Sequence, residues 1–251
     1  MSSLTLTALR AIPEVRAGDD LALLIAGALT ATGVPAAHGD VLVVAQKIVS
    51  KSEGRVVALD GVVPSARAAD YARITGKDPR YVELVLRESV RIVRAAPGVL
   101  IAEHRLGCVM ANAGIDRSNV PGEDCVLLLP EDPDASARAL RDGLHAACGA
   151  GIGVLVIDSF GRPWRHGVVG TALGVAGLPA LVDLRGRPDR QGRALQLTQV
   201  ALADGLAAAA SLLMGEGAEG APVVHARGVP YPRRESSVRE LLRPAAEDLF
   251  R

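Results

Sequence analysis

Two continuously apolar runs rich in β-branched residues constrain the fold of this chain more than any other feature. Residues 41–45 read Val-Leu-Val-Val-Ala, and residues 153–157 read Gly-Val-Leu-Val-Ile. A strand with one solvated face alternates apolar and polar side chains, so these unbroken runs predict central, buried strands. The first run is followed by Gln46-Lys47 and the second by Asp158-Ser159. The sequence therefore predicts a buried sheet with polar groups where its strands end.

The rest of the chain predicts an α+β fold with mixed, largely antiparallel sheets and flanking helices. Further strands are expected over residues 4–11, 99–102, 106–111, 125–129 and 222–226, and helices over 21–29, 65–75, 78–95, 136–148 and 193–214. Strands and helices do not alternate strictly, which argues against a doubly wound sheet. The chain also contains neither GxxxxGK[ST] nor GxGxxG, so neither a P-loop nor a Rossmann nucleotide site is expected.

Composition narrows the possible partners. The 28 basic and 28 acidic residues cancel, so no charge imbalance favours nucleic acid or an anionic membrane as a partner. Three cysteines without metal-ligand spacing, together with an N-terminus unlike a signal peptide, predict a cytoplasmic protein. Lysines occur only at positions 47, 51 and 77, and two of the three lie just after the first buried strand. A lysine in that place can act as a point charge on phosphate.

Two carboxylates follow predicted strands, Asp116 after residues 108–111 and Asp158 after residues 153–157. Oxygen ligands of this kind suit Mg²⁺ or Mn²⁺, and the Ser159 hydroxyl could add another. The same aspartates could instead be turn formers or helix caps. Residues 215–220 read Gly-Glu-Gly-Ala-Glu-Gly, which could bring a third carboxylate to a metal or could simply end a helix.

Four ordered segments carry a resemblance to a known family. Residues 39–55, 112–119, 158–165 and 213–217 resemble the signatures of the coenzyme F-420 gamma-glutamyl ligases, and the likeness spans about residues 4–228. Residues 236–251 are similar to the junction that follows the N-terminal domain in the two-domain actinobacterial form. We therefore expect a ligase domain over residues 1–230, as one unit or two interlocked subdomains. Residues 231–251 are expected to be a polar tail or a linker to a second domain, with no flavin site in this chain.

The resemblance implies GTP-dependent amide formation between L-glutamate and the terminal carboxylate of the coenzyme F-420 precursor, through an acyl phosphate. It implies a homodimer with an intertwined fold of the family's own, two Mg²⁺ or Mn²⁺ sites and a K⁺ site. The implied metal ligands are Asp116, Asp158, Ser159 and Glu216, and the implied catalytic residues are Asp116, Asp158 and Lys51. The implied GTP contacts are Ile12, Pro13, Glu14, Val15, Gln46, Lys47, Lys51, Asn119, Met214, Gly215, Glu216, Gly217, Ala218, Glu219, Gly220 and Ala221.

Two other classes of function remain open from the residues alone. A non-catalytic module that binds a nucleotide or phosphorylated metabolite would use glycine loops and strand-end lysines equally well. A metal-dependent phosphohydrolase would use the same carboxylates, with water in place of glutamate as the acceptor. Only the ligase requires an amino-acid substrate, so glutamate dependence distinguishes these alternatives.

Overall fold

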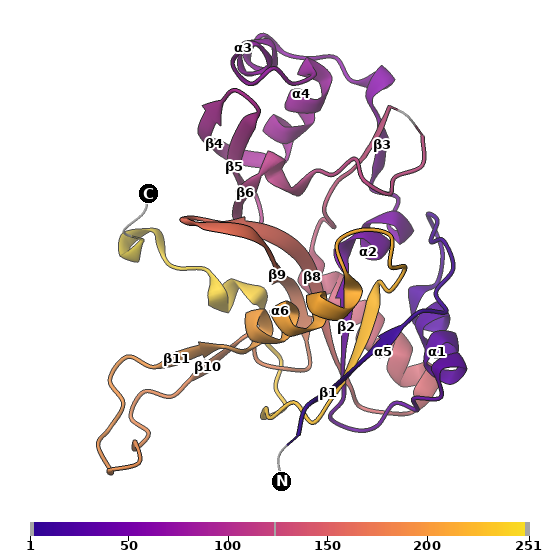
Figure 1. The fold of residues 1–251 in the computed structure, drawn as a ribbon, viewed down its shortest axis with the longest axis vertical. Coiled ribbons are helices and arrows are strands. Elements are labelled where there is room, and N and C mark those ends of the chain that lie inside the picture. The colour runs from indigo at the N-terminus through magenta and orange to yellow at the C-terminus, as the bar shows by residue number, and fades with distance from the viewer. Residues whose placement is uncertain (1–2, 123, 249–251) are drawn as a thin grey trace.

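A five-stranded sheet forms the centre of the molecule (Figure 1). The computed structural model describes residues 3–122 and 124–248. The sheet contains, in spatial order, β1 (Thr5–Leu9), β12 (Val223–Arg227), β2 (Val41–Ala45), β8 (Gly153–Arg162) and β9 (Arg165–Ala176). The β2–β8 pair is parallel and the other neighbours are antiparallel. The predicted α+β class with largely antiparallel sheets is confirmed.

Helices cover both faces of this sheet. Helices α1 (Leu21–Thr32) and α5 (Pro133–Cys148) pack on one face with Leu42 and Val44 of β2. Helix α6 (Leu202–Met214) packs on the other face with Val41 and Val43. Successive side chains of a strand point to opposite faces, so both sets are buried only if both faces are covered. This arrangement explains the unbroken apolar run in β2.

A smaller lobe with its own core lies at the top of Figure 1. It contains α3 (Ala66–Thr75), α4 (Pro79–Arg87) and the antiparallel sheet of β4 (Ser89–Ala96), β5 (Val99–His104) and β6 (Val109–Ala111). Strand β3 (Val56–Ala58) pairs with β7 (Cys125–Leu127) beside it. Short 3-10 turns occupy Leu59–Gly61, Asn112–Gly114, Val238–Leu241 and Ala245–Glu247.

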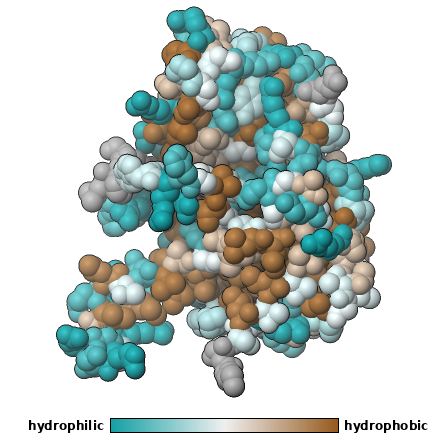
Figure 2. All heavy atoms as spheres, in the orientation of Figure 1, coloured by the Kyte–Doolittle hydropathy of each residue, from teal (hydrophilic) through white to brown (hydrophobic). Residues whose placement is uncertain are grey.

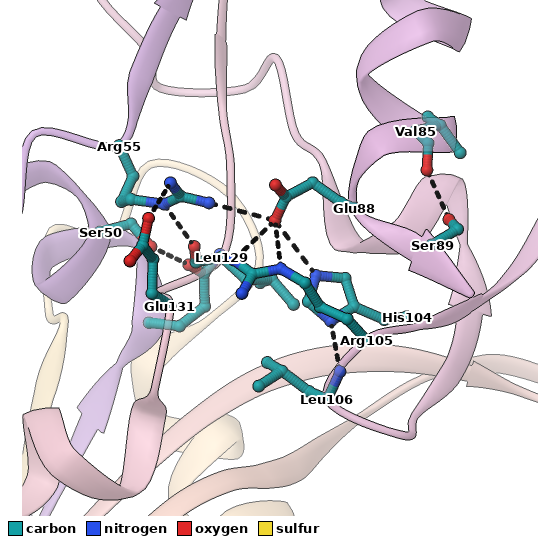
Figure 3. A network of polar contacts seen from close by, with 11 residues as sticks. Ser50, Arg55, Val85, Glu88, Ser89, His104, Arg105, Leu106, Leu129 and Glu131 are labelled. Atoms are coloured by element: carbon teal, nitrogen blue, oxygen red, sulfur yellow. Dashed lines mark hydrogen bonds and ion pairs between the residues drawn. The ribbon is translucent and has the colours of Figure 1, made fainter.

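An ion-pair network joins this lobe to the chain segments beside the central sheet (Figure 3). Arg55, which follows the short helix α2 (Gln46–Ser52), donates to Glu88 Oε2 at 3.1 Å and to the Leu129 carbonyl at 2.9 Å. Arg105 also donates to Glu88 Oε2, at 3.1 Å. Burial raises the pKa of Glu88, but hydrogen bonds from His104 and Arg105 and the charge of Arg55 outweigh it and hold the pKa at about 2. Glu88 therefore stays ionised and links the two parts of the fold.

A two-stranded arm extends away from the core at the lower left of Figure 1. Strands β10 (Leu181–Asp183) and β11 (Gln199–Ala201) form its base, and residues 184–198 form its tip. Residues 231–238 return to the core, where Val238 is buried and the Ser237 hydroxyl donates to Asp134 Oδ2 at 2.6 Å. Within the described residues, no helix combines the length and apolar character that crossing a bilayer requires.

Three predicted boundaries are wrong by five residues or more. The helix expected over residues 78–95 ends at Arg87, because residues 89–96 pair with β5 instead. The helix expected from residue 193 begins at Leu202, after the arm. The strand expected to end at Ile157, β8, continues to Arg162 in a hairpin with β9, which places Asp158 inside a strand. The parallel pairing with β2 does end at Ile157, opposite Ala45.

Candidate functional site

A cleft of about 430 Å³ lies where the parallel pairing of β2 and β8 ends. Four segments far apart in sequence form its walls: residues 12–15 after β1, the β2–α2 junction, Ile157 to Ser159 of β8, and the end of α6 with the loop that follows it. Asn119 contributes from a fifth segment. The residues on these segments combine apolar side chains with charged groups, which suits a ligand that has both a ring and phosphates.

The cleft brings together nearly all the residues implied as nucleotide contacts. Those lining it are Ile12, Pro13, Glu14, Val15, Gln46, Lys47, Lys51, Asn119, Met214, Gly215, Glu216, Gly217, Ala218, Gly220 and Ala221. Glu219 does not line it, and its Oε2 accepts a hydrogen bond from the Gly217 amide at 2.8 Å within the loop. The structure adds Ser211, Ile48 and Pro222 to the walls. Ser211 lies three residues before Met214 on α6, so helical spacing could have indicated it.

Helix α2 places two lysines and a glutamine beside the cleft. It starts directly after β2, and Lys47 and Lys51 are one helical turn apart. The side chain of Lys51 is 8% exposed, and its Nζ contacts Glu14 Oε1 at 2.5 Å. The Ser50 hydroxyl donates to Gln46 Oε1 at 2.8 Å and fixes the amide orientation. Gln46 Nε2 is buried without a short hydrogen bond among the described residues, and the Gln46 side chain favours the ionised form of Asp158, which also lines the cleft.

Asp116 does not line the cleft but reaches it through Lys47. Its Oδ2 is 2.7 Å from Lys47 Nζ, and its Oδ1 accepts from the Ser118 amide at 2.7 Å. Burial raises the pKa of Asp116, but the bonds from Lys47 and Ser118 outweigh it and lower the pKa. The loop that carries it has positive φ at Asn112, Ala113 and Asn119, conformations that cost free energy in residues other than glycine and often occur at functional sites.

Asp158 has the opposite titration behaviour. Burial and the charge of Asp116 raise its pKa to about 6, although the Ser159 amide, Lys47 and Gln46 favour the ionised form. The neighbouring Ser159 hydroxyl donates to Glu216 Oε1 at 2.7 Å, which ties β8 to the glycine-rich loop. The pKa values of Asp116 and Asp158 are thus shifted in opposite directions, and shifted pKa values of this kind are typical of functional sites.

The oxygens of this region fit a hard divalent cation. No three of the described His, Cys, Asp and Glu side chains are grouped closely enough to hold an ion by themselves. Mg²⁺ characteristically takes one or two carboxylates and completes its shell with water and substrate phosphate. Asp158, which lines the cleft, and the Ser159–Glu216 pair offer such incomplete oxygen sets. The donor chemistry therefore fits the metal that the sequence resemblance implies.

The comparisons with known proteins identify the family. Residues 10–228 match the family described as F420-0:Gamma-glutamyl ligase. The chain belongs to this family. It is 46% identical over 250 residues to the coenzyme F420:L-glutamate ligase of Methanothermobacter thermautotrophicus, with 99% of each chain covered. It is 48% identical over 243 residues to that of Methanopyrus kandleri, with 95% of this chain and 94% of the relative covered.

The family match includes the whole candidate site. All four signature segments, and every residue that lines the cleft, fall within residues 10–228. The F420-0:gamma-glutamyl ligase family is named for amide-forming enzymes, so the predicted class of acid–amino-acid ligase is confirmed. The roles of individual residues stay predictions.

Proposed function

We propose that this protein uses GTP to join L-glutamate to the terminal carboxylate of the coenzyme F-420 precursor. The family membership supports the glutamate and the precursor, because the relatives are named as coenzyme F420:L-glutamate ligases. The observation that carries the proposal is the cleft itself, which gathers Lys47, Lys51, Asp158 and Glu216 from three distant segments. Forming an amide from a carboxylate requires activation, and these groups suit phosphoryl transfer.

The proposed reaction has two steps. A carboxylate oxygen of the precursor attacks the γ-phosphorus of GTP, and the bond between that phosphorus and the oxygen bridging to the β-phosphate breaks. The products of this step are an acyl phosphate and GDP. The glutamate amine nitrogen then attacks the acyl carbon, phosphate departs, and the nitrogen loses a proton to give the amide. Lys47 and Lys51 would neutralise phosphate charge, and the glycine-rich loop 215–220 would allow close approach of the nucleotide. Asp116 would position Lys47 through their 2.7 Å ion pair.

The metals belong to the same proposal. Asp116 and Asp158 would hold one Mg²⁺ or Mn²⁺ and Ser159 with Glu216 a second, alongside a K⁺ site. When bound, such ions neutralise charge that develops on the transferred phosphoryl group. Asp158 is mostly ionised at pH 7 because its pKa is about 6, and a cation beside it would favour the ionised form further.

We further propose that the protein is a cytoplasmic homodimer with its ligase unit in residues 1–230. Large apolar side chains are exposed on the arm and on α6, including Leu197 at 87% and Leu212 at 84%. Figure 2 shows apolar surface gathered over these elements. Exposed apolar patches of this kind characteristically mark interfaces.

The first experiment combines the purified protein with GTP, Mg²⁺ or Mn²⁺, L-glutamate and the precursor, and follows products by mass. The wild type should add glutamate to the precursor in step with GDP release. Asp158→Asn keeps the shape but loses the charge, so the rate should fall at least about 100-fold.

The matched control is Asp70→Asn, which changes an exposed aspartate of α3 and should leave the rate unchanged. GTP turnover at the full rate without glutamate would instead favour a phosphohydrolase. GTP binding with no glutamylated product would favour a non-catalytic module.

A further inference from the structure

A second cavity, of about 440 Å³, lies on the small lobe. Its walls come from the start of α4 and from the loop that carries Asp116. They include Lys77, Asp78, Tyr81, Asn112, Asp116 and Arg117. Of these residues, only Asp116 was predicted from the sequence to belong to the functional site. The cavity has no residue in common with the cleft.

Asp116 connects the two cavities. It lines the second cavity, and its carboxylate forms the 2.7 Å ion pair with Lys47, which lines the cleft. The charge of Asp116 also acts on Asp158 inside the cleft. A small molecule in the second cavity would therefore lie next to the groups proposed to handle phosphate.

The charges of the second cavity are unbalanced. Its two carboxylates are already paired, Asp78 with Arg80 at 2.7 Å and Asp116 with Lys47. Its two cations, Lys77 and Arg117, form no ion pair with any residue that the structure describes. The cavity thus presents two available positive charges, an arrangement that suits a ligand with two negative ones.

The walls also restrain one of these cations and offer a polar atom. Tyr81 is buried, its hydroxyl donates to the Ile115 carbonyl at 2.8 Å, and its ring centre lies 4.9 Å from the Arg117 guanidinium. The attraction between the guanidinium and the ring favours this position of Arg117, which lines the cavity. Asn112 Oδ1 is buried without a hydrogen-bond partner among the described residues, and such oxygens normally accept one.

We infer that this cavity binds the amino-acid acceptor, L-glutamate, an inference that rests on the proposed function. Lys77 and Arg117 hold its two carboxylates, and a small rotation of Asn112 lets Oδ1 accept from its amino group. Asn112 and Asp116 belong to the same loop, and Asp116 is ion-paired with Lys47 of the cleft. The planar guanidinium of an arginine can bind a carboxylate through two parallel hydrogen bonds.

The walls fit the amino acid better than the other two substrates. The nucleotide and the deazaflavin precursor both carry flat rings, which bind best against apolar or aromatic surfaces. In the second cavity, the face of Tyr81 is covered by Arg117, and most other lining residues are polar. The apolar residues Ile12, Val15 and Met214 lie in the cleft instead.

Steady-state kinetics of the purified protein test this assignment. Lys77→Gln and Arg117→Gln should each raise KM for L-glutamate about tenfold while KM for GTP and for the precursor stays unchanged. Arg117→Lys, which keeps the charge but loses the planar fork, should have a smaller effect. Arg73→Gln, an exposed arginine of α3 paired with Asp70 at 3.1 Å, is the control and should change none of the three constants.

The outcomes distinguish a failure of the proposed function from a failure of the cavity assignment. If the wild type makes no glutamylated product, the proposed function fails. If the wild type is active but both variants keep a normal KM for glutamate, the cavity assignment alone is wrong. A rise in KM for the precursor instead of glutamate would also overturn it. Thermal melts of each variant confirm that a changed KM does not come from unfolding.

Discussion

At the scale of single residues, environment gives similar side chains different properties. Asp116 and Asp158 are indistinguishable as candidate ligands in the sequence, yet the structure lowers the pKa of one and raises that of the other. The difference arises because Asp116 accepts direct bonds from Lys47 and Ser118, whereas burial dominates at Asp158. Residue type made both aspartates candidate ligands, but the order of their ionisation depends on contacts that only folding creates.

Gly174 of β9 offers a residue-scale prediction about stability. A Cβ at this position would overlap the carbonyl oxygen of Pro133, at the start of α5. Backbone atoms on both elements must then move, so Gly174→Ala should lower the free energy of unfolding by about 1–3 kcal/mol. Urea denaturation followed by circular dichroism measures this.

Gly27→Ala is the matched control for Gly174→Ala. Gly27 lies inside α1, where an added methyl group would have no neighbouring atom within 4 Å, and its φ is ordinary. Alanine has the higher helix propensity, so this change should raise stability by up to about 1 kcal/mol. Equal stability of the two variants would contradict the close packing of β9 on α5.

At the scale of elements, local pattern predicted most strands and helices, and long-range pairing decided the exceptions. The strand at 41–45 forms as predicted, and the helices expected from residues 21, 65 and 78 begin within one residue of those positions. Residues 89–96 contain Val90, Ile92 and Val93, which favour strand, but they adopt it by pairing with β5. Helix α2 was not predicted, because its seven residues are too few for a helical pattern to show.

Asp40 supports an element-scale prediction because it joins β2 to β12. It is 2% exposed, and its carboxylate accepts from Arg227 Nη2 at 2.7 Å and contacts His225 Nε2 at 2.7 Å. Burial raises its pKa, but hydrogen bonds from Arg227, His225 and the Ala37 amide outweigh this and lower the pKa to about 2. A depressed carboxylate pKa stabilises the fold above the unfolded value of 3.8, and this stabilisation is lost as pH falls towards 2.

We therefore expect Asp40→Asn to destabilise the protein by about 1–2 kcal/mol at pH 7. This is less than the free energy that corresponds to the full pKa shift of Asp40, because solvent screens the half-exposed Arg227. The difference from wild type should shrink between pH 4 and pH 2. Denaturation curves at pH 7, 4 and 2.5 measure it. Asp183→Asn, which removes an exposed aspartate paired with Arg185, should have little effect at any of these values. A pH-independent loss in Asp40→Asn would refute the ionic explanation.

At the scale of the whole molecule, the candidate cleft could be predicted and the second cavity could not. The sequence segments that form the cleft each carry recognisable polar residues, and the parallel β2–β8 pair brings two of them to the same place. Lys77 and Tyr81 lie on a segment without such a pattern, and Arg117, although it belongs to the 112–119 segment, had no predicted role. Their meeting depends on how α4 packs against the Asp116 loop, which no local signal encodes.

Assembly gives the last prediction. If the exposed apolar surface of the arm and α6 forms the proposed dimer interface, a charge placed there must be buried without a partner, at a large cost in free energy. Leu212→Asp and Leu197→Asp should each shift the protein towards monomer, as measured by analytical ultracentrifugation over a concentration series. Leu23→Asp, on an exposed leucine of α1, is the control and should leave the association unchanged. A wild type that stays monomeric at all concentrations would exclude the dimer. Dimers that tolerate both the arm and the α6 substitutions would show that the interface lies elsewhere.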